Sequence, residues 1–153
     1  MARKEFSEEE KKRVTEIVSR YVDLQTTPFG KPVRGPVRVD KRQPMYGGNG
    51  TVYLFQMFGE GELVNNRIGA YMVLLTKNDE AGFHTHGTRK EQELYVIMHG
   101  EGKYMDRDGA FGETRTQKVK KGSVTAVRGS GFHAIRNTGD EPLIVFVITT
   151  NEA

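Results

Sequence analysis

The sequence predicts an all-β domain, a sandwich or barrel of short strands, preceded by one α-helix and an extended arm. Three observations support this. From Thr51 onward, short runs rich in β-branched and aromatic residues alternate with turns, a spacing typical of sandwiches and barrels. A helix-start signal stands near the N-terminus, and a stretch rich in proline and glycine separates it from the first run. The 153 residues suit one domain whose core is stable without cross-links.

The predicted helix begins with the capping box Ser7-Glu8-Glu9-Glu10, in which the Glu10 side chain reaches back to the N-cap. Apolar residues then recur at helical spacing and form one stripe: Val14, Ile17, Val18, Tyr21 and Val22. An apolar stripe has to be covered. We therefore expect this helix to pack on the outside of the barrel or on a second subunit.

Residues 27 to 50 form the predicted arm. The stretch contains four prolines and several glycines, so it predicts extended chain with at most short edge strands. Asp40 is the only acidic residue among the basic residues of this stretch, which are Lys31, Arg34, Arg38, Lys41 and Arg42. A solvated charge run is the simplest interpretation. The functional alternative is an anion-binding lid near the barrel mouth, for a phosphorylated or carboxylated substrate.

The strands are expected at regular intervals after the arm. The runs are residues 51–58, 68–76, 91–98, 101–106, 114–119, 123–128, 132–137 and 142–150. Asp106-Arg107-Asp108-Gly109 is expected to form a hairpin connection. Gly47-Gly48-Asn49-Gly50 precedes a strand rather than a helix, so we interpret it as a flexible turn and not as a phosphate loop.

Three histidines and a glutamate are the most informative residues of the chain. Residues two apart on a strand point to the same side, so a strand through His84 and His86 aims both rings into one interior. Glu93 opens an apolar and aromatic run that predicts the next strand, and His133 lies on a later strand. Three imidazoles and one carboxylate can form a cage for a divalent metal ion.

These residues give the chain a resemblance to the cupin superfamily. That family carries a first motif of the form G-x5-H-x-H-x3-4-E-x6-G and a second of the form G-x5-P-x-G-x2-H-x3-N. The residues that fall on the motifs are His84, His86, Glu93 and Gly100 for the first, and Gly122, His133 and Asn137 for the second. The resemblance covers roughly residues 68 to 150. It implies a double-stranded β-helix, or jelly-roll barrel, over residues 51–153, with the helix and extended arm of residues 1–50 packed on it.

The chain departs from the first motif in two places. Asn78 stands where the motif opens with glycine, and six residues rather than three or four separate His86 from Glu93. The long gap leaves Glu91 as a rival ligand. We prefer Glu93 because it keeps the six-residue step to Gly100, whereas Glu91 is expected in the loop before strand pairing starts.

One divalent ion is therefore expected, with His84, His86, Glu93 and His133 as its ligands. Three nitrogens and one oxygen suit Mn(II), Fe(II), Ni(II), Co(II) or Zn(II), and the ligand set does not choose among these metals. Four protein ligands on an octahedral ion leave two positions for water or substrate, whereas a tetrahedral zinc would be closed and structural. Tyr95 shares the strand face of Glu93, so it is a candidate cavity or catalytic residue, with core packing as the alternative.

The resemblance implies several functions for such a site. The leading hypothesis is an enzyme whose ion acts as a Lewis acid on a small oxygenated metabolite, in isomerase, lyase or decarboxylase chemistry. The metabolite would be a sugar, a sugar phosphate, or a hydroxy or keto acid. The alternatives are a non-catalytic metal- or metabolite-binding sensor module and a metal-dependent dioxygenase. The resemblance also implies a homodimer, because family members often pair through N-terminal strands and sheet edges.

Composition excludes several other classes of protein. The chain has no cysteine, so neither disulfides nor a thiolate metal site can form, and a cytoplasmic location fits. No apolar run approaches the roughly 18 residues that a membrane helix needs, and the charged N-terminus does not predict a signal peptide. A net charge of +3 and a single N-terminal helix give no case for nucleic-acid binding. We expect a small-molecule partner, with neither nucleic acid nor membrane.

Overall fold

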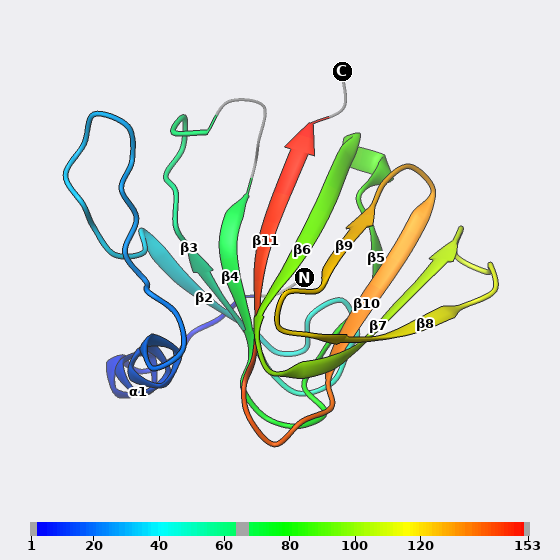
Figure 1. Ribbon diagram of the computed structural model, residues 1–153, viewed down its shortest axis with the longest axis horizontal. Coiled ribbons are helices and arrows are strands. Elements are labelled where there is room, and N and C mark those ends of the chain that lie inside the picture. Colours follow the sequence, from blue (N-terminus) through cyan, green and yellow to red (C-terminus); the bar gives the residue numbers. More distant parts are fainter. Residues whose placement is uncertain (1–2, 64–67, 152–153) are drawn as a thin grey trace.

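The computed structural model describes residues 3–63 and 68–151 and arranges them as two β-sheets with one helix outside (Figure 1). Residues 1–2, 64–67 and 152–153, which fall inside the predicted domain boundaries, lie outside the described residues. In chain order the elements are β1 (Arg3–Lys4), α1 (Glu8–Ser19), β2 (Arg38–Arg42), β3 (Val52–Gln56), β4 (Gly69–Leu74), β5 (Glu80–Thr85), the 3-10 helix η1 (Gly87–Arg89), β6 (Glu91–His99), β7 (Glu101–Asp108), β8 (Arg115–Lys120), β9 (Val124–Val127), β10 (Gly131–Asn137) and β11 (Leu143–Asn151).

The two sheets face each other and diverge toward the top of Figure 1. The larger has the strand order β1-β2-β3-β4-β11-β6-β9 and the smaller the order β5-β10-β7-β8. All named strand pairings are antiparallel. From β4 to β11 the chain passes back and forth between the sheets, apart from the β7–β8 hairpin. This is a double-stranded β-helix, and it confirms the predicted all-β jelly roll with an N-terminal helix and arm.

Side chains alternate along the strands of the larger sheet, so each of its faces carries its own apolar cluster. The inner face packs against the smaller sheet, where Leu74 and Leu143 join Ile135. The outer face packs under α1, where Phe55 meets Val14. The helix begins at the predicted N-cap, where the Ser7 side chain accepts a hydrogen bond of 3.1 Å from the Glu10 backbone N–H. The Glu10 carboxylate, which was expected to reach back to the N-cap, instead binds the Tyr53 hydroxyl and Lys41 Nζ.

One predicted turn lies further along the chain than expected. β7 continues to Asp108 because Asp106 pairs across the ladder with Arg115 of β8 and binds its guanidinium, while Asp108 pairs with Gly131 of β10. The hairpin connection therefore follows Asp108 rather than occupying residues 106–109. Gly109 is its first residue and has a φ of +74°, a conformation that favours glycine.

The arm is part of the folded core structure, because it contributes a strand to the larger sheet and packs against β5. Its strand β2 pairs with β3 along five residues and widens the larger sheet. The glycine-rich segment after it, predicted as a flexible turn, instead packs directly against β5. A Cβ on Gly48 would lie 2.2 Å from the carbonyl oxygen of Glu80, and one on Gly82 would lie 2.3 Å from that of Tyr46. Only glycines allow these two backbones to approach so closely, and the approach brings Tyr46 toward the interior.

Within residues 3–63 and 68–151, no helix has both the length and the apolar character to cross a membrane. The α-helix α1 has 12 residues and carries three glutamates in its first turn.

Candidate metal centre

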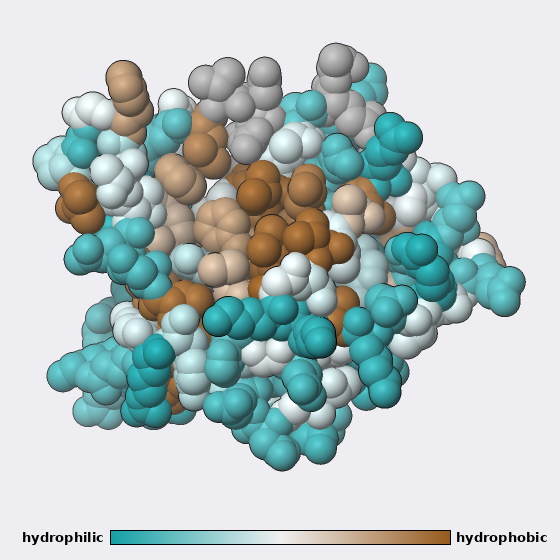
Figure 2. Space-filling view, viewed as in Figure 1, coloured by the Kyte–Doolittle hydropathy of each residue, from teal (hydrophilic) through white to brown (hydrophobic). Residues whose placement is uncertain are grey.

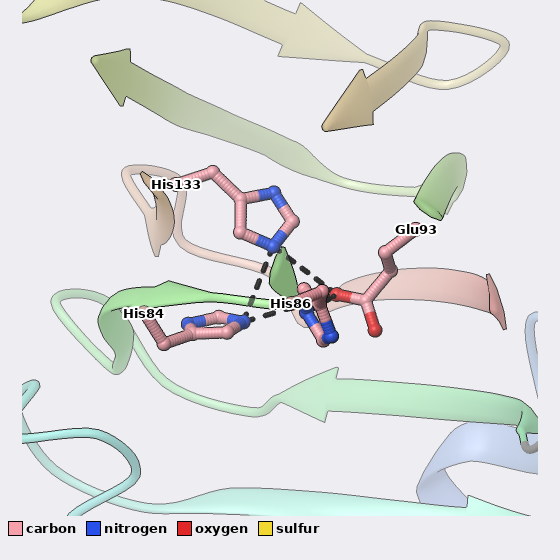
Figure 3. Close-up of side chains that lie close together, drawn as sticks. All are labelled: His84, His86, Glu93 and His133. Atoms are coloured by element: carbon pink, nitrogen blue, oxygen red, sulfur yellow. Dashed lines mark hydrogen bonds and ion pairs between the residues drawn. The ribbon is translucent and has the colours of Figure 1, made fainter. Parts of the chain in front are cut away.

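Four side chains that the sequence analysis singled out meet between the two sheets, as Figure 3 shows. His84 lies on β5, His86 directly follows that strand, Glu93 lies on β6 and His133 on β10. His84 and His133 are direct cross-strand partners. Each of the four residues is at most 7% exposed. One ligand atom from each lies within 4.8 Å of all the others, so the fold gathers them from three strands into one place.

The three imidazoles turn their Nε2 atoms toward one carboxylate oxygen. Glu93 Oε1 lies 2.9 Å from His86 Nε2, 3.1 Å from His133 Nε2 and 3.8 Å from His84 Nε2. The Nε2 atoms of His84 and His133 are only 3.2 Å apart. The three rings therefore point their Nε2 atoms at a common centre. This orientation requires a contact that fixes each ring at its Nδ1 atom.

Contacts at the three Nδ1 atoms provide that hold. His84 Nδ1 lies 2.7 Å from the carbonyl oxygen of Gly82, which can only accept, so Nδ1 carries the proton and Nε2 a lone pair. His133 Nδ1 lies 2.9 Å from the Tyr104 hydroxyl. His86 Nδ1 lies 3.4 Å from the buried carboxylate of Glu91 and 3.2 Å from Arg89 Nη2, which belongs to the arginine that pairs with Glu91. Outer contacts of this kind orient imidazoles toward a metal ion.

These four residues fit a divalent metal ion. With a lone pair on His84 Nε2 and an acceptor on Glu93, His133 Nε2 faces two acceptors at hydrogen-bond distance and has at most one proton to offer. His86 Nε2 is buried, and its contact of 2.9 Å with Glu93 Oε1 does not have the geometry of a hydrogen bond. Burying such acceptors against one another is costly, whereas one cation with bonds of about 2.1 Å would satisfy all of them. The donor set suits the first-row metals from Mn(II) to Zn(II).

The protonation states of the cluster also suit a cation. Burial alone would raise the pKa of Glu93, but its contacts with His133, His84 and His86 outweigh burial and lower that pKa well below the ordinary value. Burial lowers the pKa of His133 to about 4, although the Glu93 carboxylate opposes the shift. At neutral pH the site therefore offers an ionised carboxylate and a neutral His133 imidazole, the forms that bind metal.

Glu91, the rival carboxylate, takes a different position. The sequence suggested that it precedes strand pairing, but β6 begins at Glu91, which pairs with Asn151 of β11. It thus shares the inner face of β6 with Glu93. Its carboxylate accepts a 2.9 Å hydrogen bond from Arg89 Nε and faces the outer nitrogen of His86. Glu93 is therefore in the cluster, and Glu91 supports it from behind.

Tyr95 lies beside the cluster on the same face of β6. It is 1% exposed, and its ring stacks on His133 with centroids 4.7 Å apart. Burial raises the pKa of Tyr95 well above its ordinary value, and the Glu93 carboxylate adds to the shift. Together with three of the four cluster residues, Tyr95 lines a cavity of about 470 Å³. The remaining lining comes mainly from the connection between β3 and β4, from the strands β2, β3 and β4, and from the segment after β2.

Other polar and aromatic side chains of the strands lie away from the cluster. Tyr71 packs against Phe146 on the outer face of the sheet, and Arg136 pairs with Glu80. Gln92 alternates with Glu91 and Glu93 and so faces away from the cluster. His99 ends β6 and stacks on Tyr21 with ring centroids 3.9 Å apart.

Of the cavity residues that come from the arm, sequence reasoning missed Tyr46 and gave Arg38 and Arg42 only as members of the basic run. Tyr46 stacks on His84 with ring centroids 3.9 Å apart, and Arg38 and Arg42 line the same cavity. The period-two spacing of Arg38, Asp40 and Arg42 was a signal that they share one face of a strand, but the sequence did not show which way the face turns.

Comparisons with known proteins agree with this architecture. The sequence model of a family described as Cupin domain matches residues 71–149, more than half of the chain. A crystal structure described as a predicted oxalate decarboxylase from Thermotoga maritima superposes with a TM-score of 0.65 at 26% identity, over 74% of this chain and 92% of that chain. No protein with a curated description matches.

Two more distant structures show the fold alone. A cupin domain from Schizosaccharomyces pombe superposes with a TM-score of 0.56 at 14% identity, over 79% of this chain and 77% of that one. A Lactobacillus farciminis oxalate decarboxylase in complex with formate gives a TM-score of 0.54 at 17% identity, over 85% of this chain and 33% of that one.

Proposed function

The chain belongs to the cupin domain family, and from that premise we propose that it is a metal-dependent enzyme acting on a small oxygenated metabolite. The observation that carries the proposal is the group of three imidazoles and one carboxylate, buried at the wall of a cavity that can admit a metabolite. A purely structural role explains it less well, because burying these polar groups without a ligand is costly.

His84, His86, Glu93 and His133 would hold one divalent ion, Mn(II), Fe(II), Co(II), Ni(II) or Zn(II). A bound ion would supply Lewis-acid polarisation of a carbonyl or carboxylate oxygen of the substrate. The apolar side chains that make up much of the cavity wall exclude water, which strengthens such electrostatic interactions.

Tyr95 is the chain's own candidate for proton transfer beside the site. Its raised pKa keeps the phenol protonated at neutral pH, so it can donate a proton but cannot act as a base. Tyr104, whose pKa burial raises to about 12, is also protonated and acts by orienting His133. We assign Tyr95 as the proton donor to charge that develops on the substrate.

A proton donor without a neighbouring base favours decarboxylase or lyase chemistry over isomerisation. Decarboxylation and related lyase reactions leave a carbanion that must be protonated, whereas sugar isomerisation also needs a base to remove a proton. The likeness to a predicted oxalate decarboxylase, at 26% identity, supports the same branch. We therefore rank a hydroxy or keto acid above a sugar or sugar phosphate as substrate, and decarboxylase or lyase chemistry above isomerisation.

A non-catalytic sensor module is the second candidate. The observation that favours it is the scarcity of proton-transfer groups near the cluster. Among the described residues that line the cavity, the titratable groups other than arginines and cluster ligands are Tyr46, Tyr95 and Glu60, and Glu60 is exposed.

The experiment loads purified protein in turn with Mn, Fe, Co, Ni and Zn and offers each form oxalate, 2-oxo acids, hydroxy acids and sugar phosphates. We expect metal-dependent release of carbon dioxide, or cleavage, from an organic acid, detected by NMR and mass spectrometry. The activity should disappear in Glu93→Gln and persist in His99→Ala, which removes a histidine outside the cluster. Oxygen consumption would indicate the dioxygenase alternative. Saturable binding without turnover under every metal would favour the sensor.

A further inference from the structure

The cavity wall formed by β2 carries a row of charged residues that the proposed chemistry does not use. Arg38, Asp40 and Arg42 alternate along the strand and therefore share one face, and both arginines line the cavity. Asp40 and Arg42 are only 5% and 8% exposed, whereas Arg38 is exposed. Charged side chains are seldom buried to this degree unless they are paired.

Asp40 holds the row together. Its carboxylate oxygens lie 3.0 and 3.2 Å from Arg38 Nε, and Oδ2 lies 3.8 Å from Arg42 Nη2. One carboxylate thus lies between two guanidinium groups, and the row of three residues has a formal charge of +1. A guanidinium offers five donors in a planar fork that matches the geometry of a carboxylate.

The other basic residues of the arm are engaged away from this wall. Arg34 and Lys31 both bind Glu62, and Lys41 binds Glu10 of α1 on the opposite face of β2. The arm as a whole is therefore not a charged lid. Only Arg38 and Arg42 of these basic residues line the cavity, because alternation along β2 places them on its inner face.

Between the arginine row and the metal centre the cavity is lined mainly by apolar side chains. These are Met45, Leu54, Phe58, Ile68, Met72 and Val147. Figure 2 shows hydrophobic side chains gathered at the centre of this face of the molecule, with hydrophilic ones around them. A ligand that spans the cavity would therefore meet oxygen-binding groups at its two ends and hydrocarbon in between.

We propose that the natural ligand is an organic acid with an apolar body, whose one end binds at the metal centre and whose other end carries a carboxylate bound by Arg42 and Arg38. This inference rests on the proposed function and narrows its substrate class. A cavity of about 470 Å³ lies in the range of pockets that enclose drug-sized ligands, and a two-carbon diacid would leave most of it filled with water. The chain is thus built for a longer acid than oxalate.

The charges around the cavity make the binding of a dicarboxylic acid dependent on the bound divalent metal ion. The cavity is lined by two guanidinium groups, from Arg38 and Arg42, and by two carboxylates, from Glu60 and Glu93. With the Asp40 carboxylate that binds both arginines, these groups sum to −1. A divalent ion changes the sum to +1. A dianionic ligand should therefore bind the metal-loaded protein and bind the metal-free protein poorly.

The test compares two acids of equal length by isothermal titration calorimetry on manganese-loaded protein. 2-Oxoadipate and 2-oxohexanoate share six carbons and the metal-binding 2-oxo acid end, but only the former has a distal carboxylate. We expect 2-oxoadipate to bind at least about tenfold tighter, as one charge-assisted interaction implies. Pyruvate, which lacks the apolar body, and fructose 6-phosphate, whose body is polar, should both bind more weakly than 2-oxoadipate.

Arg42→Gln should reduce the preference for 2-oxoadipate to about twofold or less, with bound manganese unchanged. Lys41→Gln is the matched control, because it removes the same charge from the adjacent residue on the opposite face, and it should keep the full preference. Should Arg42→Gln fail to fold, the half-exposed Arg38→Gln tests the same row and should also reduce the preference.

Equal affinity for the two acids, a preference that survives both arginine substitutions, or tighter binding of fructose 6-phosphate would overturn this inference. Metal-dependent binding of the acids would in those cases leave the proposed function standing. Binding of none of the probes to the metal-loaded protein would overturn both.

Discussion

The two faces of the larger sheet are made by alternate residues of the same strands, yet they are built for opposite purposes. The outer face is apolar beneath α1, where Phe55, Val73 and Ile144 are fully buried. The inner face lines a cavity and carries the Glu93 carboxylate of the candidate metal centre. The three imidazoles of the centre come from β5, the residue after it and β10, and they face Glu93 from the smaller sheet. Because successive side chains point to opposite faces, residues that stabilise the fold alternate along a strand with residues that line the binding site. Substitutions on adjacent residues should therefore have different consequences.

The largest stability effect is expected on the outer face. Phe55→Ala removes a fully buried ring from beneath α1 and should lower the free energy of unfolding by about 3 to 5 kcal/mol. Bound metal per folded chain should not change, because Phe55 points away from the inner cluster. Leu54→Ala, one residue earlier on the cavity wall, should also destabilise but should in addition change the affinity for organic acids. Chemical denaturation and calorimetry check both variants, and loss of metal binding in folded Phe55→Ala would break the separation.

A metal ion bound between the two sheets should stabilise the fold without involving the outer face. At a free ion concentration about 100 times the dissociation constant, binding to the native state adds about 2.7 kcal/mol to the free energy of unfolding. Denaturation of chelator-treated and manganese-loaded protein measures this difference. His99→Ala should retain the whole increment and His86→Ala should lose most of it. An equal increment in the two variants would contradict the assignment of His86.

Glu91 should strengthen metal binding without being a ligand of the ion. Glu91→Gln keeps the shape of the side chain but weakens the contact with His86 Nδ1 and the ion pair with Arg89. Loss of an outer partner of this kind typically lowers metal affinity about 10- to 100-fold. Competition with a fluorescent chelator would measure it, with Glu80→Gln as a control that breaks an ion pair outside the centre. Complete loss of bound metal would make Glu91 a ligand.

The smallest effect is expected where α1 is fastened to the outer face. The Glu10 carboxylate accepts hydrogen bonds of 2.5 Å from the Tyr53 hydroxyl and 2.9 Å from Lys41 Nζ, and these bonds lower its pKa. A lowered folded-state pKa contributes stability above the unfolded value of about 4.5, and that stability is lost as the pH falls below it. Glu10→Gln should cost about 1 kcal/mol at pH 7 and progressively less below pH 4.5.

Denaturation at pH 7 and pH 3 measures the difference for Glu10→Gln. Glu9→Gln, an exposed neighbour on the helix, serves as the control and should cost little at either pH. A cost for Glu10→Gln that does not change with pH would show that the contact stabilises through shape rather than charge.

Most of the strands and the four cluster residues were predictable because both follow local rules. Alternation marks a strand, and residues two apart on it share a face, so His84-Thr85-His86 and Glu93 followed by Tyr95 indicated one interior. The long gap before Glu93 left the choice of carboxylate open, because the start of β6 depends on its pairing with Asn151. That pairing is a contact between distant parts of the chain.

The arm could not be placed from sequence for the same reason. Its course depends on the close approach of Gly48 to Gly82, which directs Tyr46 against His84 and turns the arginine face of β2 into the cavity. Neither composition nor periodicity encodes that approach. The division into a helix and arm over residues 1–50 and a barrel over residues 51–153 stays a prediction, as does the homodimer.

The central claim is that His84, His86, Glu93 and His133 bind one divalent metal ion. Its most direct test is elemental analysis of untagged protein that has been loaded and then dialysed free of excess metal. We predict one ion per chain for the wild type and for His99→Ala, and none for the double variant His86→Ala/His133→Ala. Metal retained in the folded double variant, or absent from the loaded wild type, would contradict the account.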